Sequence, residues 1–202
     1  SLADLTSSQR FAARYFDAYA ASRLAQVRDA HLLLLASASY YLCDLPGSAG
    51  VVVSHVRPQE LNLDAGGLEG LLFWLLRGDF SATLDLTGLP KYREAISRIS
   101  LGMKEFYELR AQEDDPLDAA THLREKVYSE GTPRELLFAD ACCSIVKRRI
   151  ENSARRSLPD FSQLPFDAWK PALAKESFVR ELWPAQRLLG QRSVFAGTSA
   201  VV

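Results

Sequence analysis

Cysteine is scarce in this chain of 202 residues, which contains only Cys43, Cys142 and Cys143. An odd count with one adjacent pair suggests neither a disulfide framework nor a zinc site, so a cysteine-stapled secreted domain and a zinc-finger module are excluded. Free thiols are typical of a reducing compartment, and the composition therefore predicts a cytoplasmic location.

Neither sign of charge is in excess, because 24 Lys and Arg oppose 25 Asp and Glu and leave a net charge of −1. Such a chain has no overall positive field to attract nucleic acid, so any contact of that kind must come from a local patch. Long apolar runs are also missing. The block His31-Leu-Leu-Leu-Leu-Ala is far shorter than the roughly 20 residues that span a bilayer. We therefore expect no membrane partner.

The sequence contains no G-x-x-x-x-G-K-[ST] loop. That loop supplies the backbone N–H groups that hold phosphates, a Lys for the phosphate charge and a hydroxyl for Mg²⁺. These 202 residues are therefore not expected to hydrolyse ATP by that route. No histidine has a His or Cys partner at helical ligand spacing, and we expect no metal site.

Apolar residues recur every three or four positions along most of the chain, which is the spacing of one helix face. The expected helices cover residues 6–45 with a possible break near 21–22, then 68–80, 90–112, 117–130, 133–156, a segment from 166 or 169 to 178, and a last one from 184. Pro46-Gly47 is expected to end the first of these regions. Val51–Val53 fits either a strand or part of a short buried helix over 49–57. Together, these expected helices predict an all-α fold, an irregular multi-helix bundle.

Two local signals divide the chain further. Thr132-Pro-Arg-Glu is the signature of a capping box, with Pro133 at the first helical position and Glu135 at the third. Three prolines in Ser157–Pro171 predict a domain boundary. We expect a helical accessory domain over residues 1–160 and a second, incomplete unit over 161–202.

One basic cluster is the best candidate for nucleic-acid contact, and its members are Lys147, Arg148, Arg149, Arg155 and Arg156. A helical period brings several of these side chains near one face, where they could neutralise phosphates. The alternative is a solvated cationic helix end that complements the helix dipole, and the near-zero net charge favours it. No aromatic residue interleaves with these arginines.

Aromatic residues recur at helical spacing near the amino terminus: Phe11, Tyr15, Phe16, Tyr19, Tyr40 and Tyr41. The simplest interpretation is a hydrophobic core. A face for a protein partner is the alternative, because Tyr and Phe are enriched at interfaces. Leu68–Leu76 is apolar on nearly all sides and likewise fits a core helix or a partner-binding helix.

The segment Leu182–Val202 reads as a short helix, a turn and the start of a buried strand. Pro184 suits the first turn of a helix, Gly197 ends the helical pattern, and Ser199–Val202 begins an apolar, β-branched run.

This segment resembles the beginning of the first RecA-like domain of superfamily 2 helicases, the DEAD/DEAH-box ATPases and their relatives. In that family an aromatic–Pro–x–Gln sequence precedes a helix, a Gly and the strand that feeds the phosphate-binding loop. The matching residues are Trp183, Pro184, Gln186, Gly197 and Ala200–Val202. The resemblance implies that Gln186 reads the adenine edge of ATP, since an amide both donates and accepts. It further implies that Trp169 supports the adenine, and that the chain stops just before the Walker A loop.

The resemblance covers about a tenth of the chain and implies a longer parent that uses ATP and Mg²⁺ to move on DNA or RNA. Residues 1–160 would then regulate that motor, bind a protein partner or guide the strand. Large helical extensions of this general kind occur in bacterial anti-phage defence helicases such as Hachiman-type systems. The alternative is a free-standing helical interaction module unrelated to nucleotide. A small helical enzyme is a third possibility, but the sequence offers no catalytic constellation for it.

Overall fold

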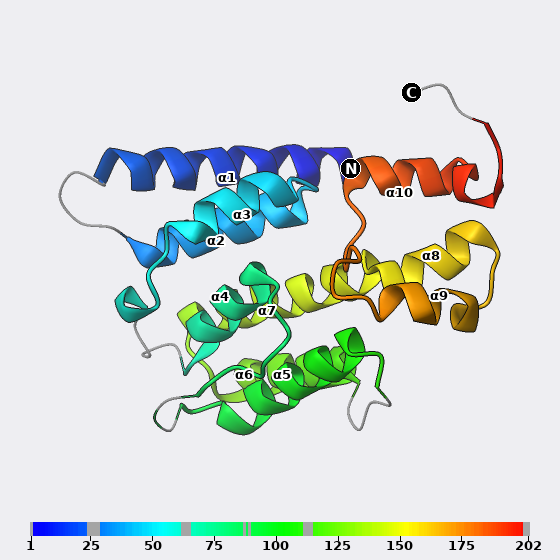
Figure 1. The fold of residues 1–202 in the computed structure, drawn as a ribbon. Coiled ribbons are helices and arrows are strands. Elements are labelled where there is room, and N and C mark those ends of the chain that lie inside the picture. Colours follow the sequence, from blue (N-terminus) through cyan, green and yellow to red (C-terminus); the bar gives the residue numbers. More distant parts are fainter. Residues whose placement is uncertain are drawn as a thin grey trace.

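The computed structural model describes residues 2–23, 29–61, 66–86, 88, 90–110 and 115–199, and within these ranges every regular element is helical (Figure 1). The helices are α1 (Leu2–Arg23), α2 (Ala30–Leu42), α3 (Pro46–Ser54), α4 (Leu68–Arg77), α5 (Arg93–Tyr107), α6 (Pro116–Glu130), α7 (Pro133–Glu151), α8 (Ala154–Ser162), α9 (Phe166–Leu173) and α10 (Pro184–Gln191), with short 3₁₀ turns η1 (Pro58–Glu60) and η3 (Val194–Ala196). The predicted all-α bundle is confirmed. No helix in the described ranges is both long and apolar enough to cross a bilayer.

Helix α7 is the central element of the bundle. It packs against α2, α4 and α6, while α1 covers α2, and α5 and α6 close the opposite side (Figure 1). Its buried residues recur at helical spacing, so one face lies in the core. These residues include Phe138, Cys142, Ile145 and Val146. Cys142 is thus a packing residue, and burial raises the pKa of its thiol.

A smaller hydrophobic cluster forms among α8, α9, α10 and η3. Ala154, Leu158 and Leu182 are its buried residues, and Phe161 and Trp169 pack against them. Two backbone hydrogen bonds tie the strand-like stretch before α10 to the end of α7: Leu182 N–H to Asn152 at 2.9 Å and Ala154 N–H to Arg180 at 2.9 Å. The predicted domain boundary at residues 157–171 stays a prediction.

Several helix ends differ from the sequence prediction. Pro46 begins α3 instead of ending a helix, because α2 has already stopped at Leu42. Val51–Val53 lies inside α3, so the helical alternative is correct. The helix expected to reach Arg156 ends at Glu151, because Ser153 caps the new helix α8. The predicted strand at Ala200–Val202 lies outside the described residues.

Two further helices are shorter than the sequence predicts. The helix expected over 90–112 begins only at Arg93 and stops at Tyr107, shortly before Leu109, which has a left-handed backbone with φ +60°. Helix α9 ends at Leu173 instead of reaching Phe178. After α9 the apolar pattern continues beyond the helix, because Phe178 of the following loop packs against the smaller hydrophobic cluster.

The predicted capping box of α7 is present. Thr132 Oγ1 accepts from the Glu135 N–H at 3.3 Å, and a Glu135 carboxylate oxygen accepts from the Thr132 N–H at 2.7 Å. Replacing Thr132→Ala removes one of the two bonds and should lower the free energy of unfolding by about 1 kcal/mol. Urea denaturation measures the loss. The control is Thr121→Ala, whose hydroxyl donates to the Leu117 carbonyl within its own helix. An equal loss in both variants would contradict the role of the cap.

Candidate functional site

Two of the three predicted nucleotide-binding residues, Trp183 and Gln186, lie at the start of α10, and the third, Trp169, lies in α9. Trp183 is the N-cap residue, Pro184 occupies the first turn, and Gln186 is half-buried with its Oε1 accepting the Trp183 N–H at 2.8 Å. This bond holds the amide in place and leaves the second lone pair of Oε1 available. Within the described residues the Gln186 Nε2 makes no hydrogen bond. The amide can therefore still offer one acceptor lone pair and both Nε2–H donors to a ligand.

The two tryptophans occupy different surroundings. The Trp183 side chain is 57% exposed and lies beside the start of α3, where a Cβ added to Gly47 would be 3.6 Å from the ring. Trp169 packs into the smaller cluster, and its Nε1–H donates to Ser162 at 2.9 Å. In the described part of the chain no hydrogen bond or ring contact joins Trp169 to Gln186.

Helix α10 is fixed to the bundle by a salt bridge. Arg187 donates to Asp44 at 2.5 Å and to the Leu182 carbonyl at 2.9 Å. Asp44 follows α2 in a left-handed conformation with φ +61°, which an L residue adopts only at a cost. The amino-terminal bundle thus holds the helix that carries Gln186.

A second, more buried connection lies directly before Trp183. Arg149 of α7 donates to Glu181 at 2.6 Å and to the carbonyls of Leu75 and Leu76 at 3.1 and 2.8 Å. The Tyr41 hydroxyl donates to the other oxygen of Glu181, and the guanidinium lies 4.6 Å from the Tyr41 ring centroid. We call Arg149, Glu181 and Tyr41 the clamp.

Burial shapes the electrostatics of the clamp. Loss of solvent by itself would lower the pKa of Arg149, but Tyr41 and Glu181 raise it above its usual value, so the guanidinium stays charged. Burial raises the pKa of Tyr41, which remains a neutral hydrogen-bond donor to Glu181. The clamp is therefore an ion pair in which each of the three guanidinium nitrogens of Arg149 donates a hydrogen bond.

The predicted basic cluster is not one free surface. Arg149 belongs to the clamp, and Arg155 donates to the Phe106 carbonyl at 2.6 Å while lying over the Phe106 ring. Burial lowers the pKa of Arg155. Arg148 donates to Leu42 at 3.2 Å. Lys147 and Arg156 are exposed.

Three of these cations face neighbouring hollows along the outer side of α7. One hollow of about 320 Å³ is lined by Gln9, Leu42, Ser144, Lys147, Arg148 and Glu151. The next, of about 420 Å³, shares Ser144, Lys147 and Glu151 with it and adds Arg156. Glu151 lies 3.9 Å from Lys147 and offsets part of the positive charge. The structure thus brings Lys147, Arg148 and Arg156 to one surface.

Other residues carry chemistry that the sequence pattern did not reveal. Glu69 of α4 is buried and accepts from Arg134 at 2.7 Å, with His31 Nδ1 3.1 Å from the same oxygen. No group of three His, Cys, Asp or Glu side chains in the described ranges has metal-binding geometry. Glu181, Asp44 and Glu69 meet their partners across long sequence separations, so no spacing rule could identify them.

A groove of about 440 Å³ lies beside α4. Its apolar lining includes Leu61, Phe73, Trp74 and Leu84, with Arg77, Asp79 and Asp85 among the polar residues. The inner face of α4 is buried in the core through Leu68, Leu71, Leu72, Leu75 and Leu76. The helix that the sequence assigned to core or partner binding is thus a core helix with one partly open side.

No family model, curated protein or solved structure matches this chain.

Proposed function

We propose that residues 1–160 are a helical accessory domain of an ATP-dependent superfamily 2 helicase, and that residues 161–202 lead into its motor. The observation that carries the proposal is the start of α10, where Trp183 is exposed and the Gln186 amide keeps a donor and an acceptor for an adenine edge. ATP and Mg²⁺ would bind in the motor of the parent, with Trp183 and Trp169 on the adenine side. The parent would act on nucleic acid in the cytoplasm, as an anti-phage defence helicase does.

The clamp gives the accessory domain a physical route to the motor. Glu181 is held by the buried Tyr41 and the largely buried Arg149, and it lies two positions before Trp183. Within α10, the helix that follows Trp183, Arg187 forms a salt bridge with Asp44. A protein partner that shifts α2 or α7 would therefore move the adenine-side residues, which is how an accessory domain can regulate ATP turnover.

The proposal is tested with Gln186→Ala in the full-length gene product. Losing one pair of hydrogen bonds to adenine costs roughly 1–1.5 kcal/mol, so we expect the KM for ATP to rise about tenfold and the preference for ATP over GTP to fall. Steady-state ATPase assays measure both. The matched control is Gln191→Ala, an exposed residue at the end of the same helix.

Two results would contradict the proposal. One is an unchanged KM and an unchanged purine preference in Gln186→Ala. The other is a gene that lacks a Gly-Lys-Thr or Gly-Lys-Ser loop after Val202, because the motor then has no phosphate-binding site.

The alternative function is a helical interaction module unrelated to nucleotide. The groove beside α4 favours it, because apolar surface rimmed by charged residues is typical of a peptide-binding site. A gene that ends without the phosphate-binding loop, together with no ATP binding, would select this alternative.

A further inference from the structure

The outer face of α1 carries three exposed rings in a row. Phe11, Tyr15 and Tyr19 are 72%, 56% and 36% exposed. They are spaced four residues apart and therefore share one side of the helix. The Phe11–Tyr15 centroids lie 6.5 Å apart with planes at 22°, and the Tyr15–Tyr19 centroids lie 6.2 Å apart with planes at 17°. We call these three residues the aromatic row.

The aromatic row does not contribute to the core. Helix α1 contacts α2 through its other side, where Ala13 is fully buried and Phe16 packs against the core cluster. Asp17 also faces α2 and accepts from the Tyr40 hydroxyl at 3.1 Å. Large apolar side chains left in solvent beside each other mark a binding surface.

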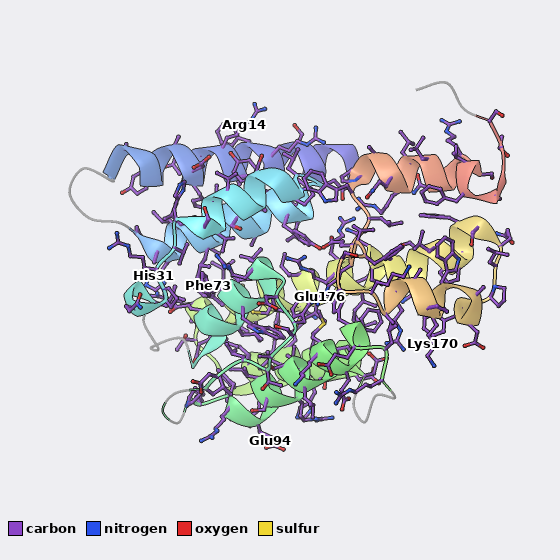
Figure 2. The ribbon with its side chains drawn as sticks, in the orientation of Figure 1. Arg14, His31, Phe73, Glu94, Lys170 and Glu176 are labelled. Atoms are coloured by element: carbon purple, nitrogen blue, oxygen red, sulfur yellow. The ribbon has the colours of Figure 1, made fainter. Side chains whose placement is uncertain are left out.

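The charge beside the aromatic row is positive. Arg10 and Arg14 are exposed, and Figure 2 shows Arg14 projecting away from the bundle on the outer side of α1. Residues 7–22 contain one acidic residue, Asp17, and its carboxylate accepts a hydrogen bond from the Tyr40 hydroxyl. A ligand at this face therefore meets arginines and flat rings, with no competing acidic side chain from the same stretch of helix.

The positive charge continues from α1 toward α7. Gln9 precedes Arg10 in α1, and its Oε1 lies 3.9 Å from the Cys43 sulfur, just after α2. Gln9 and Arg148 also line the same hollow, together with Lys147. The part of α1 that carries Arg10 therefore borders a hollow that contains two cations of α7. Of these, Lys147 lies 3.9 Å from Glu151 and Arg148 lies 3.9 Å from Asp44.

We propose that the outer face of α1 binds single-stranded nucleic acid. Bases stack on the aromatic row, and the phosphates lie along Arg10, Arg14 and Arg148. Unpaired bases are required, because the ring faces must reach the faces of the bases. Every base has such a face, so binding is tolerant of sequence. This surface adds a strand-binding site to the proposed function and needs no nucleotide.

The test measures binding of the whole 202-residue chain to fluorescein-labelled oligo-dT and oligo-rU of about 16 nucleotides, by anisotropy without ATP. Stacking is worth about 1–3 kcal/mol per base, so Phe11→Ala with Tyr15→Ala should weaken binding about 25-fold or more. The double variant Phe11→Tyr with Tyr15→Phe, which keeps both rings, should bind as tightly as the unsubstituted 202-residue chain. The matched control is Tyr128→Ala, a 54% exposed tyrosine on α6, and circular dichroism checks the helical content of each variant.

A second variant tests the phosphate contacts. Arg10→Ala with Arg14→Ala should reduce the slope of log K against log salt by about 1.4, since each phosphate contact with a single strand contributes about 0.7. Equal binding of DNA and RNA oligonucleotides supports stacking as the common chemistry.

Three outcomes overturn the inference. The first is no binding by the unsubstituted 202-residue chain at about 50 mM salt. The others are unchanged binding in Phe11→Ala with Tyr15→Ala, and duplex DNA that binds as tightly as the single strand. The first of these would leave the aromatic row to a protein partner. None of them affects the Gln186 experiment, so failure of this inference is distinguishable from failure of the proposed function.

Discussion

Replacing Arg149→Ala should lower the free energy of unfolding by about 3–5 kcal/mol. The substitution leaves the Glu181 carboxylate, whose side chain is 16% exposed, without its cation. It also removes the donors to the Leu75 and Leu76 carbonyls. An uncompensated buried charge is among the few causes of losses this large. Urea denaturation followed by circular dichroism measures the change.

The neighbouring Lys147→Ala is the control for this prediction. Lys147 makes a 3.9 Å ion pair on the surface, and such pairs contribute about 0.2–1 kcal/mol. The double variant Arg149→Met with Glu181→Gln should cost less than the sum of the two single changes, because each single change leaves one unpaired charge and the double variant leaves none. A loss below about 1 kcal/mol for Arg149→Ala would mean that the clamp is open to water.

Phe138→Ala should also cost about 3–5 kcal/mol. The Phe138 side chain is 2% exposed in the main core, and the His31 ring meets it edge-on at a centroid distance of 6.4 Å. Truncation loses the burial of the ring and leaves a cavity between α7 and its neighbours. Chemical denaturation of the same chain gives the difference.

Leu137→Ala is the matched control, because Leu137 precedes Phe138 on α7 but is 52% exposed. Surface changes of this kind stay within about 0.5 kcal/mol. Similar losses for both variants would mean that the face of α7 assigned to the core is wrong.

The local signals in the sequence were enough to predict the fold class and many helices. The spacing of apolar residues predicted α4, α6 and α7, and the Thr132–Glu135 capping box is present. Helix ends were harder, as the false end at Pro46 illustrates. A proline is as suitable for the first turn of a helix as it is for a break, and only the packing of α3 on α2 decides between them.

The candidate site shows the same division. The resemblance proposes Gln186 and Trp183 as nucleotide-binding residues, and this stays a prediction. The structure puts both at the start of α10, where Trp183 is exposed and Gln186 is half-buried. The basic cluster was read as one group, but Arg149 and Arg155 are turned into the fold while Lys147 and Arg156 remain exposed. Positions in a helical sequence give the direction of a side chain relative to its neighbours, and they do not say which direction is the interior.

The sequence by itself determined the helical architecture, because helix formation depends on hydrogen bonds, caps and apolar spacing within a few residues. Tertiary structure decided which charges and rings are buried. The Arg149–Glu181 pair joins residues that are 32 positions apart, and the Tyr41–Glu181 bond joins residues that are 140 positions apart. In α1, Phe11 faces solvent whereas Phe16 packs against the core. Burial is a property of distant segments brought together, and no local period of the chain records it.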